Sequence, residues 1–140
     1  MFKKILVAFD GSKQSQKALK EALGLARKAG AALTVLNVDE DMIPLVSETG
    51  PAFMVQKELD AMAQLEIRKA KFIARGAGVK AEYALVKGHP AAAILDYAKR
   101  GKFDMVVVGA KGVGGIERLL LGSVSESVVS HAHCAVLIVK

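Results

Sequence analysis

Apolar residues along the chain follow two alternating patterns. Segments rich in branched apolar residues predict five strands, at residues 5–9, 32–38, 79–86, 105–108 and 135–139. Between them, apolar residues recur at helical spacing, which predicts a first helix with its apolar positions between residues 18 and 29, and further helices over residues 55–75, over a short stretch opening at Pro90, and over 124–133. The irregular stretch 39–54 contains two prolines and a glycine and is predicted as a loop or short insertion.

The alternation of strands and helices predicts an α/β fold. Strands separated by helices pair in parallel, because each crossover returns the chain in the same direction. The expected architecture is an open, Rossmann-like parallel sheet of five strands with helices on both faces. Chain order alone does not fix the order of the strands in space. If the first strand is central, with the second and fourth beside it, the ligand crevice lies over the carboxyl ends of the first and fourth strands.

Length and composition narrow the class of protein. With 140 residues, of which 52% are hydrophobic, the chain is expected to form one domain over residues 1–140. Every apolar run is far shorter than the ~18 residues of a membrane helix, and the first run stops at Asp10 without a cleavage site of a signal peptide. The only cysteine, Cys134, excludes an intramolecular disulfide, so we expect a reducing compartment, most simply the cytoplasm.

The net charge of +6 and the pI near 9.5 raise the question of nucleic-acid binding. The basic residues are scattered along the chain, tryptophan is absent, and only 5% of residues are aromatic, so platforms for base stacking are scarce. We therefore expect a solvated basic surface and neither a nucleic-acid nor a membrane partner.

The segment with the most chemical information is rich in glycine and runs from Gly109 to Ser123, between the fourth strand and the last helix. Gly109 and Gly112 lack a Cβ, so their amides can approach an anion closely. Gly122 and Ser123 precede a helix, whose first N–H groups and dipole attract phosphate, and the Ser123 and Ser125 hydroxyls are further donors. The spacing matches neither a P-loop nor the glycine fingerprint of dinucleotide-binding folds.

The pattern Gly109-x2-Gly112-x9-Gly122-Ser123 resembles the nucleotide-binding motif of the universal stress protein family, in its ATP-binding branch. The opening residues 4–12, the Gly88-His-Pro-Ala turn and the ending from Leu119 to Val139 resemble the corresponding parts of that family, so the similarity covers essentially the whole chain. The family's fold implies the strand order 3-2-1-4-5. The last strand is preceded by His133-Cys134, where relatives often carry proline.

The resemblance implies ATP and Mg²⁺ as cofactors and assigns the contacts residue by residue. Ala8 and Phe9 would flank the base, Val38 would read adenine through its backbone, and Asp10 would accept from ribose hydroxyls or approach the metal through water. The phosphates would be held by the glycine-rich segment and the helix after it: Gly109, Gly112, Gly122, Ser123, Val124 and Ser125, with a weaker contribution from the charge of Lys111. The resemblance also implies a homodimer that pairs through the strand at 135–139.

Several of these residues have a plainer structural interpretation. Asp10 is also placed to cap the first helix, although we expect Ser12 to be its cap and Ser15 to be exposed. The sequence His131-Ala-His133-Cys134 resembles a metal cluster, but no further ligands are evident. We interpret it as structural, with a histidine at a helix C-terminus, and assign no metal ligand.

The favoured function is that of a nucleotide-dependent sensor or regulator in the stress response. A slow ATPase or an autophosphorylating enzyme using the same site is an alternative, with Ser123 or Ser125 as acceptor. Because no P-loop lysine or arginine-finger motif is present and Asp10 is the only well-placed acid, no catalytic residue is assigned. A nucleotide-free interaction module is the third class, and the glycine motif counts against it.

Overall fold

The computed structural model describes residues 2–40, 50–111 and 121–140, in which strands and helices alternate. Their bounds are β1 (Lys4–Ala8), α1 (Lys13–Ala29), β2 (Ala32–Asp39), α2 (Pro51–Ala74), β3 (Ala81–Lys87), α3 (Pro90–Arg100), β4 (Met105–Gly109), α4 (Ser123–His131) and β5 (Ala135–Val139). The predicted alternation of strands and helices is therefore confirmed.

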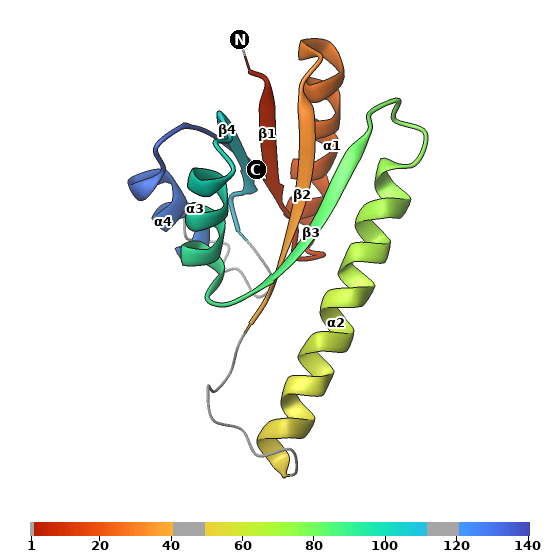
Figure 1. Cartoon of the computed structure of the whole chain (residues 1–140), viewed down its shortest axis with the longest axis vertical. Helices are drawn as coiled ribbons and strands as arrows, with labels where there is room; N and C mark the ends of the chain where they lie inside the picture. The colour runs from red at the N-terminus through yellow and green to blue at the C-terminus, as the bar shows by residue number, and fades with distance from the viewer. Residues whose placement is uncertain (1, 41–49, 112–120) are drawn as a thin grey trace.

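The strands form one parallel sheet in the order β3-β2-β1-β4-β5, as the family resemblance implies. On the central strand, Ile5 is in register with Leu33 of β2 and with Met105 of β4. From β1 the chain first builds outward through β2 and β3, and then crosses to the other side of β1 to form β4 (Figure 1). The order of strands therefore reverses between β1 and β4, which is where open sheets of this kind bind ligands.

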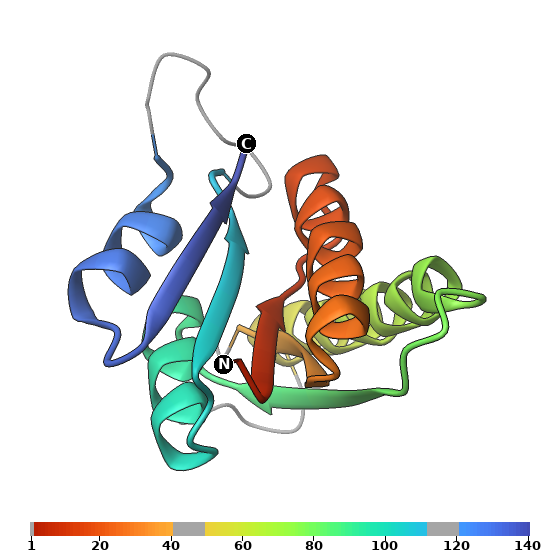
Figure 2. The ribbon, with the colours of Figure 1, turned by 90° about the horizontal axis from the view of Figure 1, so that it is seen from above.

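Helices cover both faces of the sheet, with α1 and α2 on one side and α3 and α4 on the other (Figure 2). Side chains of β1 alternate between the two faces. Ile5, Val7 and Phe9 belong to the core on the α1–α2 side. Leu6, together with Val106 and Val108 of β4, packs in the core on the α3–α4 side. The central strands are buried on both faces, which explains their nearly continuous apolar sequence.

Helix α1 begins and ends at the residues that the sequence indicates. The Ser12 hydroxyl accepts from the backbone N–H of Ser15 at 3.2 Å, which makes Ser12 the N-cap, and Gly30 ends the helix with a φ of 64°. The expectation that Ser15 is exposed is wrong. Its side chain is buried and its hydroxyl donates to the Ser12 carbonyl at 3.0 Å, because this first turn lies against the end of β1.

Two helix boundaries differ from those predicted. Helix α2 begins at Pro51, so the last residues of the predicted loop 39–54 are helical, because proline suits the first helical position and Gly50 at φ 109° turns the chain into the helix. Helix α4 ends at His131 and not at residue 133, since Ala132 is extended, with φ −68° and ψ 145°. Across the described ranges, no helix combines the length and the apolar composition needed to cross a membrane.

Candidate functional site

The carboxyl ends of β1, β2 and β4 meet the first turns of α1, α3 and α4 at one edge of the sheet. A cavity of about 390 Å³ opens at this edge between the start of α3 and the start of α4. Its lining comes from the end of β2 and from both helices: Glu40, Gly88, His89, Pro90, Ala91, Ser123, Val124 and Ser127. Two of the residues predicted to bind phosphate, Ser123 and Val124, therefore face a cavity at the end of the sheet where ligands of this fold class bind.

The first turn of α4 has the geometry of an anion site. Gly122 is the N-cap, with φ −76° and ψ 167°, and its carbonyl accepts from Glu126 N at 3.0 Å. A glycine cap has no side chain that could bond the following amides, so the N–H groups of Ser123 and Val124 have no partner within the helix. These amides and the exposed Ser123 hydroxyl are available to an anion in the cavity.

Two other predicted phosphate ligands have a structural role instead. The Gly122 amide donates to the Ala110 carbonyl at 2.6 Å. The Ser125 hydroxyl is buried and lies 2.7 Å from the same carbonyl, to which it donates. Both bonds fix the start of α4 against the end of β4. In this conformation the Ser125 hydroxyl hydrogen is used by the Ala110 carbonyl, and a contact of Ser125 with phosphate stays a prediction.

Gly109 is required for a different reason from the one predicted. A Cβ at this position would lie 3.0 Å from both the backbone carbon and the Cβ of Gln14, in the first turn of α1. The missing side chain therefore admits the backbone of α1 rather than an anion. The same glutamine reaches the next turn, since its Oε1 accepts from the Lys111 amide at 2.5 Å. Gln14, which the sequence interpretation missed, joins α1 to the start of the glycine-rich segment.

Gly112 lies outside the described residues, as does the rest of the segment 112–120. The part of the motif that the structure describes consists of Gly109 and Lys111 after β4 and of residues 122–125 at the start of α4. These two parts are held together through the Ala110 carbonyl. The described residues on the two sides of segment 112–120 are thus adjacent.

Asp10 follows β1 and is held in place by the turn into α1. Its Oδ1 accepts from the Ser12 amide at 2.9 Å, and its own amide lies 3.4 Å from the Ser15 hydroxyl oxygen. A carboxylate has about four acceptor positions, so the bond to Ser12 does not prevent it from accepting further hydroxyl groups. Asp10 therefore orders the turn between β1 and α1, and its contact with a ribose or a metal ion stays a prediction.

The two residues before Asp10 differ in what they offer to a ligand. Phe9 is only 2% exposed and packs in the core on the α1–α2 side. The alternation of β1 turns the phenyl ring into the core, so the predicted contact of Phe9 with a base, which stays a prediction, would come from its backbone. Ala8 is half-buried on the opposite face, beside the core on the α3–α4 side.

The backbone of Val38 points toward the crevice. The Leu36 carbonyl accepts from Phe9 N on the β1 side, and the Asp39 carbonyl accepts from Gly88 N on the β3 side, both at 3.0 Å. Successive residues of a strand direct their N–H and C=O groups to alternate sides. Val38 therefore directs both groups to the β1 side, as Leu36 does, but beyond the end of β1. This is the position from which a backbone could read the edge of a base.

Asn37 and Glu66 form a polar contact beneath this crevice that the sequence interpretation missed. Asn37 is fully buried, and its Nδ2 donates to the Phe9 carbonyl at 2.9 Å and to Glu66 Oε2 of α2 at 3.3 Å. Burial, opposed by the hydrogen bond from Asn37 and reinforced by the negative charges of Asp10 and Asp39, raises the pKa of the Glu66 carboxyl from 4.5 to about 7. The sequence feature that could have indicated this contact is the single asparagine within the predicted strand 32–38.

This raised pKa predicts a pH-dependent stability. Below about pH 4.5 the Glu66 carboxyl is protonated in both the folded and the unfolded state, and its contribution to stability is fully present. As the pH rises through about 7, the folded protein must hold a negative charge at a half-buried position, and that contribution to stability is lost. From pH 5 to pH 8, the free energy of unfolding of Glu66→Gln should therefore increase relative to that of wild type by about 1–2 kcal/mol, allowing for solvent screening. Urea unfolding across this range measures it.

The exposed Glu21 of α1 provides the matched control, because Glu21→Gln makes the same change of charge far from this contact. Its difference from wild type should stay nearly constant with pH. A Glu66→Gln difference that is equally constant would show that the Glu66 carboxyl titrates alike in the folded and unfolded protein.

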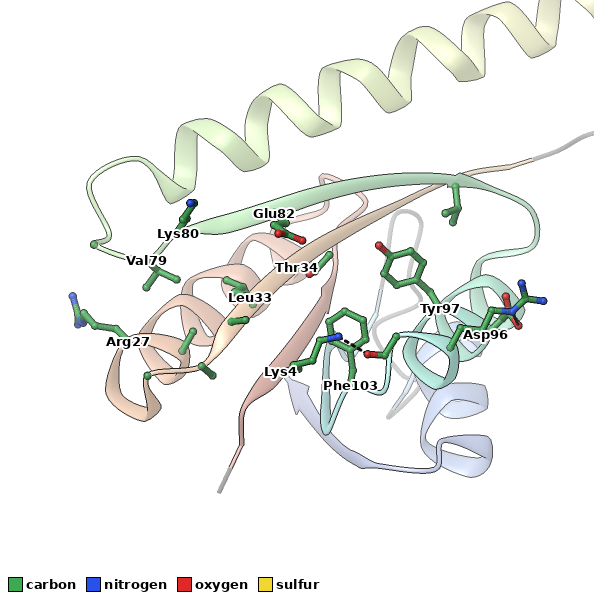
Figure 3. Close-up of a pocket in the computed structure, with 18 residues that line it drawn as sticks. Lys4, Arg27, Leu33, Thr34, Val79, Lys80, Glu82, Asp96, Tyr97 and Phe103 are labelled. Atoms are coloured by element: carbon green, nitrogen blue, oxygen red, sulfur yellow. Dashed lines mark hydrogen bonds and ion pairs between the residues drawn. The ribbon is translucent and has the colours of Figure 1, made fainter.

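A larger cavity, of about 1170 Å³, lies at the opposite end of the sheet (Figure 3). It is lined by the amino ends of the strands, including Lys4, Leu33 and Lys80, and by Tyr97 and Phe103 at the end of α3 and before β4. None of the residues predicted to bind nucleotide lines it. Because ligands of open parallel sheets bind at the carboxyl ends of the strands, we place the candidate site at the smaller cavity.

His131 has the structural role proposed for it, since its Nδ1 lies 2.9 Å from the Ser127 carbonyl one turn earlier. Within residues 2–40, 50–111 and 121–140, no three histidine, cysteine, aspartate or glutamate side chains come together as a metal site of the protein's own would require.

The chain matches the universal stress protein family over residues 1–140. A universal stress protein of Bacillus subtilis is 38% identical over 149 residues, with all of both chains covered. One from Methanocaldococcus jannaschii is 37% identical over 142 residues, covering all of this chain and 83% of the relative.

Solved structures agree with these relatives. A universal stress protein in complex with cAMP is 30% identical and superposes with a TM-score of 0.77, covering 99% of this chain and 97% of that one. The fold is also that of the Archaeoglobus fulgidus protein in complex with dAMP, at 24% identity and a TM-score of 0.75, covering 99% and 98%. Together with the strand order and the motif at both ends of the glycine-rich segment, these matches show that the chain belongs to the universal stress protein family.

Proposed function

We propose that this protein binds ATP with Mg²⁺ at the carboxyl edge of β1 and β4 and acts as a nucleotide-dependent regulator of a stress response in the cytoplasm. The observation that carries the proposal is the first turn of α4, which has no side-chain cap and whose residues Ser123 and Val124 line a cavity beside the start of α3. Relatives of the same fold that bind cAMP and dAMP support an adenine nucleotide as the ligand.

Each part of the ligand has a set of residues suited to it. The phosphates would lie on the amides and hydroxyl at the start of α4, with the positive charge of Lys111 nearby. The ribose would donate to the Asp10 carboxylate, and adenine would pair with the N–H and C=O groups of Val38, beside Ala8. Mg²⁺ would be held by phosphate oxygens and would approach Asp10 through water, since this ion keeps several of its waters.

The whole chain, residues 1–140, would act as a single domain that pairs with a second copy through β5. β5 is an edge strand of the sheet and carries the apolar sequence Ala135–Val139. An unpaired apolar edge invites association, and antiparallel pairing with a second β5 would cover it. Nucleotide binding would then influence the dimer through the glycine-rich segment, which follows β4, the neighbour of β5.

Calorimetric titration with ATP, with and without Mg²⁺, and with adenosine tests the proposal. ATP with Mg²⁺ should bind with a dissociation constant of about 1 mM or lower, and adenosine should bind at least about tenfold more weakly, because the α4 amides contact only phosphate. GTP should also bind more weakly, since its base offers a different edge to Val38. Equal affinity for ATP and adenosine, or no heat of binding at millimolar ATP, would show that the first turn of α4 does not bind phosphate.

A further inference from the structure

Helix α2 carries an exposed apolar stripe on the face opposite to its buried one. Its small residues Ala63, Ala70 and Ala74 are buried, the last two in the core between α1 and the sheet. On the other side, four apolar residues are open to solvent: Val55 at 38%, Met62 at 55%, Leu65 at 56% and Phe72 at 71%. The helix lies at the margin of the molecule (Figure 1), so none of the described elements covers this stripe. An apolar stripe of this extent marks an interaction surface.

The stripe has the spacing of a coiled coil. Val55, Met62 and Lys69 are seven residues apart, and so are Glu58, Leu65 and Phe72, three positions further along. These are the a and d positions of a heptad repeat, and all six residues are exposed. The α2 stripe, defined by these six residues, would therefore form one continuous seam against a second helix.

The order of residues along the α2 stripe is complementary to itself when reversed. If a second α2 runs antiparallel about the point midway between Ala63 and Gln64, a and d positions face each other in pairs. Met62 then faces Leu65, Val55 faces Phe72, and Glu58 faces Lys69, each pair occurring twice. Apolar residues meet apolar residues, and each carboxylate meets an ammonium. A parallel pair would instead place Glu58 on Glu58 and Lys69 on Lys69.

The positions that flank the seam fit the same arrangement. In the antiparallel pair, Arg68 lies opposite Ala61, and Met54, which is itself 59% exposed, lies beside the end of the partner helix at Ala74. No like charges meet at these flanking positions. Arg75, which follows the helix, places its guanidinium over the Phe72 ring, 5.6 Å from the ring centroid.

We propose that α2 is a self-association surface, at which two copies of this chain pair their α2 helices antiparallel through the α2 stripe. The contact is isologous, so it closes as a dimer, and it is separate from any pairing through β5. The buried Glu58–Lys69 layers set the orientation, in the way that polar residues at a and d positions do. The proposal does not depend on nucleotide binding.

Sedimentation velocity over a series of protein concentrations tests the α2 contact with a charge swap. Glu58→Lys puts lysine against lysine in two layers, and Lys69→Glu puts glutamate against glutamate, so each should raise the dissociation constant of this association at least about tenfold. The double variant Glu58→Lys/Lys69→Glu restores opposite charges and should return to the wild-type curve. Lys57→Glu, at an exposed position on the same helix outside the seam, is the control for net charge and should leave the curve unchanged.

All three substituted positions are exposed, and circular dichroism checks that the fold is retained in the four variants. If β5 also pairs, wild type forms a larger assembly and the single variants lose only the α2 step, so the comparison remains valid. Identical curves for wild type and Glu58→Lys would overturn the proposal and leave the stripe to a partner of another kind. Failure of the double variant to recover would overturn the antiparallel pairing.

Discussion

Replacing Ser123 by proline is expected to weaken the binding of ATP with Mg²⁺ at least about tenfold. Proline has no N–H group, so the substitution removes one amide from the proposed phosphate site together with the serine hydroxyl. Hydrogen bonds to a charged ligand contribute about 1.5–3 kcal/mol each, and the loss of one such bond accounts for the expected change. Adenosine, which has no phosphate, should bind to the variant as it binds to wild type.

The substitution is compatible with the fold at this position. Ser123 is the first residue of α4, and at this position the N–H group has no acceptor within the helix, so proline is common there. The residue before a proline must be extended, and Gly122 already has φ −76° and ψ 167°. Ser123→Ala, which removes only the hydroxyl, is the control and should lose less affinity. Wild-type affinity in Ser123→Pro would show that the α4 amide does not contact phosphate.

Replacing Gly109 by valine is expected to lower the free energy of unfolding by about 2–4 kcal/mol and the melting temperature by about 6–12 °C. The new Cβ would lie 3.0 Å from the backbone carbon of Gln14 and 3.2 Å from its carbonyl oxygen. Backbone atoms of α1 cannot turn away as a flexible side chain can, so α1 must shift relative to β4. Thermal and urea unfolding measure the effect.

Gly24 offers the matched control for this effect. It lies within α1, and a Cβ there would meet no atom within 4 Å. Gly24→Ala should therefore raise the free energy of unfolding by about 0.5–1 kcal/mol, since glycine is a poor helix former. If Gly109→Val unfolds at the same temperature as wild type, the close approach of α1 to β4 is not what requires a glycine.

The sequence was most informative where one physical rule dominates. The apolar runs of β1 and β4 reflect burial on both faces, and Ser12 and Gly30 are typical residues of helix ends, so these features were predicted from spacing and residue type. The strand order came from the resemblance to the family, because pairing between segments far apart in the chain leaves no local pattern. The start of α2 at Pro51 was missed because proline occurs both in loops and in first helical turns.

The residues of the candidate site were predicted from the sequence, but several of their contacts within the fold were not. Ser125 and Gly109 carry the residue types of a phosphate site, yet the structure uses the hydroxyl to hold α4 and the missing Cβ to admit Gln14. Tertiary packing decides which neighbour contacts a small residue, and the spacing of residues along the chain does not encode that packing. For the same reason the contact between Asn37 and Glu66 was not predicted, since the two residues come from elements that meet only in the folded protein.

The most direct measurement of the central claim is a titration of ¹⁵N-labelled protein with ATP and Mg²⁺, followed by nuclear magnetic resonance. The largest amide shifts should occur at Ser123 and Val124, with further shifts at Asp10 and Val38, and adenosine should move only the latter two. If the shifts instead gather around Lys4, Tyr97 and Phe103, at the larger cavity, the nucleotide binds at the other end of the sheet and the assigned site is wrong.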